Sequence, residues 1–85
     1  PLLAIRKQIL SAVDLVVFIK RFRDGKRRIV NVTELTGMEG DTITMQDVFS
    51  WSASSQTFSP TGLVPTFVSK LEEAGIAIPR GFFSK

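Results

Sequence analysis

Hydrophobic residues at the start of the chain recur with the period of an α-helix. The residues that share one side of such a helix are Leu2, Ile5, Ile9 and Val13. Pro1 suits the first helical position, because proline lacks the amide hydrogen that would go unpaired there. The spacing therefore predicts a helix over residues 1–13. A helix this short depends on packing against other elements for most of its stability.

Three later segments have the alternation and composition of β-strands. They cover residues 15–22, 27–35 and 42–51, they are rich in β-branched and aromatic side chains, and turn residues separate them. Residues 15–19 are apolar at every position, which is typical of an interior strand covered on both faces. In the third segment Asp47 is the polar exception on a side that is otherwise apolar. The apolar residues of that side are Ile43, Met45, Phe49 and Trp51.

The remainder of the chain predicts a short strand and a second helix. Residues 56–59 are expected to return along the third strand, which would pair Trp51 with Phe58. A helix is expected over residues 65–74, and Gly75 suits the position after its end. The apolar tail residues, expected to lie back on this domain or on a neighbouring one, are Ile76, Ile78, Phe82 and Phe83. The predicted fold is an α+β fragment with an N-terminal helix, an antiparallel meander of three to four strands and a C-terminal helix.

Two glycine-containing segments predict the reversals of this meander. Asp24-Gly25 is a strong signal for a two-residue type I′ turn, which needs positive φ at both central positions. Such a turn would place Ile19 opposite Val30, and a slip of one residue would move each side chain to the other face. The segment 37–41, Gly-Met-Glu-Gly-Asp, predicts a second tight reversal.

The same register makes predictions about the tip of the first hairpin. It places Arg21 opposite Arg28, which is mildly unfavourable because the charges are alike. It places Phe22 opposite Arg27, where a cation–π contact of about 0.5–1 kcal/mol would compensate in part. The tip therefore combines strong positive charge with an aromatic side chain.

Charge is distributed unevenly along the 85 residues. The net charge is +3, and the positive charge is concentrated around one reversal, while the rest of the chain has more acids than bases. The positive charge is therefore local to one hairpin tip and does not mark a general nucleic-acid-binding surface. One interpretation is a solvated tip that prevents aggregation, and the other is a contact with an acidic partner or a phosphate. The candidate partner-contact residues are Arg21, Arg23, Lys26, Arg27 and Arg28.

The sequence predicts no catalytic, cofactor-binding or metal-binding residue in this chain. It contains no cysteine and no histidine, so the usual nucleophile–base pairs and the commonest metal ligands are missing. The segment 37–41 lacks the phosphate-loop pattern, and Glu39 and Asp41 would repel phosphate. Asp14 and Glu34 are expected to approach each other across the first hairpin, but capping is the simpler role for Asp14.

Four segments of this sequence resemble a known protein family. They are residues 12–17 (AVDLVV), 21–28 (RFRDGKRR), 32–41 (VTELTGMEGD) and 43–49 (ITMQDVF). They are similar to the C-terminal part of the type II/IV secretion system ATPases, and more narrowly to the tight-adherence (Flp) pilus assembly branch. The tail from Pro60 onward also resembles that branch. The run from Glu34 to Phe49 is the most specific part of the match.

The resemblance implies the end of a RecA-like α/β motor domain. It implies a cytoplasmic hexamer, peripheral at the inner membrane, in which ATP hydrolysis drives secretion or pilus assembly. Its partners would be the other subunits and an inner-membrane platform protein. The ATP and Mg²⁺ sites of such a parent lie upstream, so no catalytic residue carries over. We therefore expect residues 1–85 to be a C-terminal segment with a structural and subunit-contact role that is inactive alone.

A different class of function stays open beside this one. The basic hairpin predicts either a small module that binds nucleic acid, which is the less favoured partner, or a contact with an acidic membrane or protein surface. Salt-dependent binding that falls when the tip arginines are neutralised would distinguish such a module from a structural segment.

Overall fold

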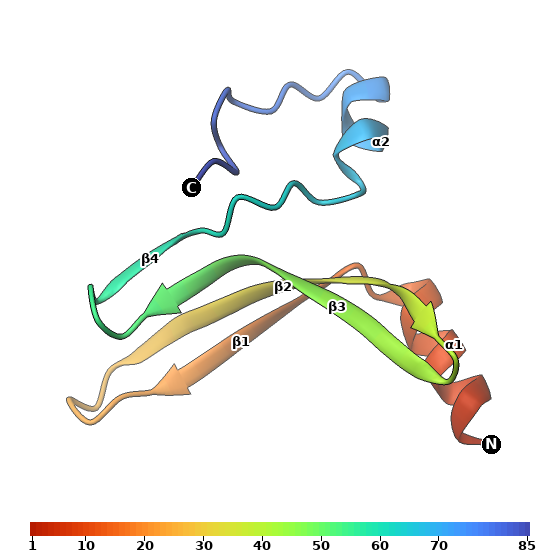
Figure 1. The fold of residues 1–85 in the computed structure, drawn as a ribbon, viewed down its shortest axis with the longest axis horizontal. Coiled ribbons are helices and arrows are strands. Elements are labelled where there is room, and N and C mark those ends of the chain that lie inside the picture. Colours follow the sequence, from red (N-terminus) through yellow and green to blue (C-terminus); the bar gives the residue numbers. More distant parts are fainter.

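The structure, a computed structural model, describes residues 1–85 and has α+β architecture (Figure 1). An N-terminal helix precedes a four-stranded antiparallel sheet with the strand order β1-β2-β3-β4, and a short helix follows. This confirms the predicted order of elements. The elements are α1 (Leu2–Ala12), β1 (Leu15–Arg21), β2 (Arg27–Glu39), β3 (Thr42–Ser52), β4 (Thr57–Pro60) and α2 (Val68–Glu73).

Two elements differ in length from the prediction. Strand β2 continues to Glu39, because Gly37 and Met38 pair with β3 and do not turn. The reversal therefore takes place at Gly40-Asp41 alone, with φ +63° at Gly40. Helix α2 has six residues, whereas a helix over 65–74 was predicted. Residues 65–67 form a turn ahead of it, in which the Val68 amide donates to the Pro65 carbonyl at 3.2 Å.

The first hairpin turns through three residues, so the predicted two-residue turn is wrong. The amide of Phe22 donates to the Lys26 carbonyl at 2.9 Å, and the amide of Gly25 donates to the Phe22 carbonyl at 3.0 Å. Gly25 has φ +82°, a conformation that glycine adopts without steric cost. As a result Arg21 pairs with Arg27, and not with Arg28 as predicted.

A bulge on β2 restores the predicted register beyond the tip. Ile19 pairs with Ile29, and the next residue, Phe18, pairs with Asn31, so Val30 is the extra residue. From that point Leu15 lies opposite Glu34, as the sequence predicts. The extra residue in the turn and the extra residue in the bulge offset each other, which keeps the side chains at the base of the hairpin on their expected faces.

A second bulge divides the residues of β3 between two faces. Thr33 pairs with Asp47 and Val32 pairs with Phe49, so Val48 is the extra residue. Because Val32 and Thr33 are neighbours on β2, their partners point to opposite faces of the sheet. Phe49 therefore does not share a face with Asp47, which corrects the alternation predicted for this strand.

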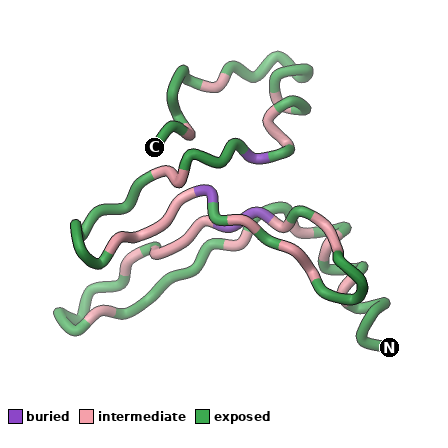
Figure 2. The backbone as a smooth tube through the Cα atoms, in the orientation of Figure 1, coloured by how far each residue is buried: buried purple, intermediate pink, exposed green.

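Few side chains are buried, as Figure 2 shows. Val48 is the single fully buried hydrophobic residue, while fifteen large hydrophobic residues are exposed. Strand β1 was predicted to be an interior strand covered on both faces, but it is an edge strand and Ile19 is 63% exposed. Helix α1 leaves its apolar side exposed as well and contacts the β2–β3 turn, where Arg6 Nη1 donates to the Asp41 carbonyl at 3.0 Å.

The C-terminal segment lies back along β3 and β4, as predicted (Figure 1). The amide of Thr61 donates to the Val48 carbonyl at 2.9 Å, and the ring centroids of Phe82 and Phe83 lie 5.8 and 6.0 Å from that of Phe49. Trp51 pairs with Phe58 in the predicted backbone register. The small core therefore forms where this tail meets the bulged part of β3.

The buried valine makes the fold testable. Val48→Ala removes two methyl groups from a buried site, so we expect it to lower the free energy of unfolding by about 2 kcal/mol. Val64→Ala is the matched control, because Val64 is 58% exposed and Val48 only 1%. Urea denaturation of both variants is the measurement, and equal stabilities would contradict this core.

Candidate functional site

The tip of the first hairpin is organised by an ion pair. Arg28 Nη2 lies 2.8 Å from Asp24 Oδ2, and Arg28 Nη1 donates to Asp24 Oδ1 at 3.3 Å. Asp24 Oδ1 also accepts the Lys26 amide at 2.9 Å. The hydrogen bonds from Arg28 and Lys26 hold the pKa of Asp24 below its ordinary value, and the carboxylate raises the pKa of Arg28. Arg28 therefore has a partner within its own chain.

Arg28 also packs on aromatic rings. Its guanidinium carbon lies 4.7 Å from the centroid of Phe22 and 5.8 Å from that of Trp51. The two rings meet edge to face, with centroids 5.4 Å apart. The sequence predicted Arg27 on Phe22. The prediction is wrong because the three-residue turn places Arg28 opposite Lys20 and within reach of that ring.

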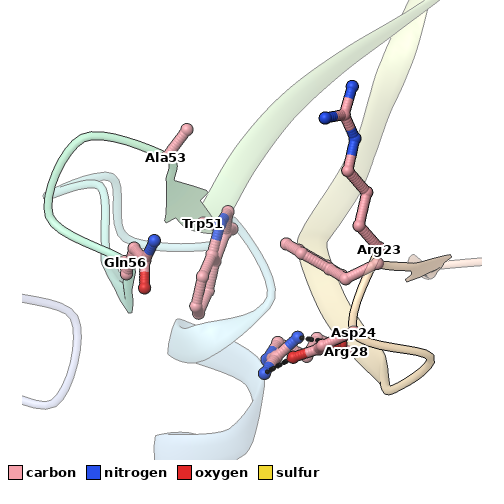
Figure 3. A pocket seen from close by; sticks show the side chains of 7 residues that line it. Arg23, Asp24, Arg28, Trp51, Ala53 and Gln56 are labelled. Carbon is pink, nitrogen blue, oxygen red and sulfur yellow. Dashed lines mark hydrogen bonds and ion pairs between the residues drawn. The ribbon is translucent and has the colours of Figure 1, made fainter.

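A shallow pocket of about 300 Å³ opens beside this ion pair (Figure 3). Figure 3 shows Asp24 and Arg28 on one side, joined by their hydrogen bonds, with Trp51 and Gln56 facing them. Arg23 also lines the pocket, and its guanidinium extends away from the ion pair. The wall of the pocket thus contains the Asp24–Arg28 ion pair, and Arg23 adds an unpaired positive charge at its rim.

Four of the five predicted partner-contact residues remain free. They are exposed, and their side chains make no hydrogen bond or ion pair within the chain. These free cations are Arg21, Arg23, Lys26 and Arg27. Arg28 differs from them, because its charge is matched by Asp24. That these residues contact a partner stays a prediction.

Glu34 on β2 forms the buried polar centre of the molecule. Its side chain is 2% exposed and accepts hydrogen bonds from the Thr66 hydroxyl at 2.7 Å, the Thr66 amide at 2.9 Å and Gln46 Nε2 at 2.9 Å. Burial alone raises the pKa of Glu34, but the donors on Thr66, Gln46 and the Phe67 amide outweigh it and lower the pKa below 4.5. The ionised carboxylate is therefore the native form at neutral pH.

These contacts give Glu34 a structural role. The sequence suggested that Asp14 and Glu34 could form a carboxylate pair capable of acid–base chemistry. In the structure the Glu34 oxygens are taken up by Thr66 and Gln46, and Asp14 meets β2 through its backbone carbonyl, which accepts the Leu35 amide at 3.0 Å. A carboxylate saturated with donors and held at a low pKa is a poor base.

Asp47 on β3 is a second oriented carboxylate, and it is exposed. Asn31 Nδ2 donates to Oδ2 at 3.1 Å, and Thr33 Oγ1 donates to Oδ1 at 2.7 Å. From the sequence, Asp47 stood out only as a polar exception on an apolar side of the strand. Its contacts with Asn31 and Thr33 on β2 depend on the register that the bulge at Val48 sets. Phe18 and Met45 complete a depression of about 360 Å³ around it.

The residues present do not fit a nucleotide or magnesium site. No group of three or more acidic side chains converges to hold a metal ion. Gly40-Asp41 closes a two-residue hairpin turn and offers no loop for phosphate, with Glu39 and Asp41 beside it. None of the helices is long and apolar enough to cross a membrane.

No family model matches the sequence, and no curated protein matches it.

The Glu34 contacts predict a specific loss of stability. Glu34→Gln replaces one carboxylate oxygen by an NH₂ group, which cannot accept a hydrogen bond from Thr66. We therefore expect the free energy of unfolding at pH 7 to fall by about 2 kcal/mol. Glu39→Gln is the matched control, an exposed residue on the same strand without an ion pair. Similar unfolding midpoints for the two variants would contradict the buried centre.

The lowered pKa of Glu34 also predicts a pH dependence. Its contribution is complete above the unfolded-state pKa, near 4.5, and is lost as the pH falls through the lower folded-state pKa. Thermal melts between about pH 6 and pH 2 should therefore show a steeper decline in the wild-type chain than in Glu34→Gln. A parallel decline in both proteins would assign the acid sensitivity to other groups.

Proposed function

We propose that this chain is the C-terminal segment of a type II/IV secretion system ATPase, of the tight-adherence pilus assembly branch. In this proposal it forms closing strands of a RecA-like motor domain and contributes to contacts between subunits. It carries out no catalysis of its own. The observation that carries the proposal is a sheet with exposed apolar side chains, built from the residues that resemble this family.

Several of the residues that carry the family resemblance also stabilise this fold, which supports the proposal. Glu34 holds the segment around Thr66, and Gly40 forms the two-residue turn. Gln46 donates to Glu34, and Val48 is the buried hydrophobic residue. All four lie in the run from Glu34 to Phe49, the most specific part of the resemblance.

Exposure of apolar surface supports a role inside a larger assembly. Strand β1 is an edge strand, and its exposed residues lie on both faces, since Val17 and Phe18 are neighbours in the strand. The apolar side of α1 is also exposed, at Leu2, Ile5 and Ile9. Proteins rarely leave apolar surface of this extent in water, and such patches are typical of interfaces.

The proposal places the chemistry elsewhere in the parent protein. ATP and Mg²⁺ would bind residues upstream of this segment. The parent would be a cytoplasmic hexamer at the inner membrane, where an inner-membrane platform protein is its partner. The free cations of the hairpin tip would then serve contacts with protein partners.

The proposal predicts the coding sequence of the parent. The reading frame that contains these residues should continue upstream and encode the pattern Gly-x-x-x-x-Gly-Lys-Ser/Thr, whose backbone amides and lysine bind phosphates. The purified full-length protein should hydrolyse ATP, and substitution of that lysine should abolish hydrolysis. A reading frame limited to these residues, or a full-length protein without ATPase activity, would refute the proposal.

A further inference from the structure

Asp47 has hydrogen-bonding capacity that no residue of this chain uses. Asn31 and Thr33 occupy one position on each oxygen and fix the plane of the carboxylate. A carboxylate accepts about four hydrogen bonds in all, so two positions face outward. No lysine or arginine of the chain lies within ion-pair distance of it. The side chain is therefore a preorganised acceptor without a cation.

The walls of the depression suit one kind of cation. Phe18 and Met45 flank the carboxylate and are 44% and 56% exposed. An aromatic face and a thioether would pack against the planar group and the methylene stem of an arginine, while the carboxylate accepts two parallel hydrogen bonds from it. A lysine would satisfy the charge but not the planar geometry. The chemistry points to a guanidinium as the ligand.

The chain itself presents such a group at another place. Arg23 stands in the turn of the first hairpin, exposed and without a hydrogen bond or ion pair. Its guanidinium extends away from the Asp24–Arg28 pair (Figure 3). We propose that the depression around Asp47 binds Arg23 of a second copy of this chain. Charge complementarity between these two patches selects the partner.

This contact joins two different surfaces of the molecule. Repetition of such a contact closes a ring if the rotation between copies permits it and otherwise extends into a filament. The inference names one subunit contact of the proposed oligomer and to that extent rests on the proposed function. Its test uses the 85-residue chain alone, so a negative result would leave the ATPase assignment to the reading-frame test.

Self-association of the chain tests the contact. Sedimentation equilibrium should show Asp47→Asn and Arg23→Gln each raising the Kd about tenfold, because each removes one partner of an oriented charge pair. The matched controls are Glu73→Gln and Arg80→Gln, which change the net charge equally at exposed residues outside the hairpin tip. They should stay within about threefold of wild type. Circular dichroism verifies that each variant is folded.

A mixture of the Asp47→Asn and Arg23→Gln chains provides the decisive test of the contact. The Asp47→Asn chain keeps its Arg23, and the Arg23→Gln chain keeps its Asp47, so an equimolar mixture should associate more tightly than either variant alone. Arg23→Gln lies in an exposed turn, so its effect does not depend on the folding of the Asp47 site. Wild-type association should also weaken as salt rises from about 0.05 to about 0.5 M.

Several results would overturn the inference. A wild-type chain that is monomeric at millimolar concentration would do so, as would variants whose Kd values match wild type. A mixture no tighter than its components would also refute it. Association that strengthens with salt would assign self-association to apolar surface. Vesicles with anionic lipid that bind wild type and lose binding with Arg23→Gln, while Asp47→Asn leaves self-association unchanged, would assign the arginine to membranes.

Discussion

The buried carboxylate of Glu34 is the interaction on which this fold most depends. Burial of a charge is unfavourable unless hydrogen bonds replace its water, and here Gln46 on β3 and Thr66, in the segment that follows β4, supply them. The contact fixes the backbone where it leaves the sheet, so α2 and the aromatic tail are directed back over β3. Without it, the small core around Val48 would lose the segment that covers it.

The bulges in the strand pairing determine which side chains lie on each face of the sheet. The bulge at Val48 separates Phe49, which packs against the tail, from Asp47, which faces the opposite side of the sheet. The bulge at Val30 likewise compensates for the three-residue turn at the hairpin tip. The tip thereby gains its Asp24–Arg28 pair, and the base of the hairpin keeps its register.

Local sequence patterns predicted the helices and strands, whereas the bulges and the buried polar contacts depend on residues far apart in the sequence. Apolar periodicity located α1, and the tail aromatics predicted a return onto the sheet. The bulges were not predictable, because an extra residue is tolerated only where turn length and packing require it. The contact of Glu34 with Thr66 joins residues 32 positions apart, which no periodicity reports. The cationic tip was visible in composition, whereas the distinct role of Arg28 followed from the observed turn.

We propose that the apolar edge of this molecule is an interface within a larger motor. Hydrogen–deuterium exchange of β1 and α1 in the full-length protein, compared with the isolated chain, tests this most directly. We expect slow exchange in the full-length protein and fast exchange in the isolated chain, because covered edge strands open less often. Equal and fast exchange in both would contradict it.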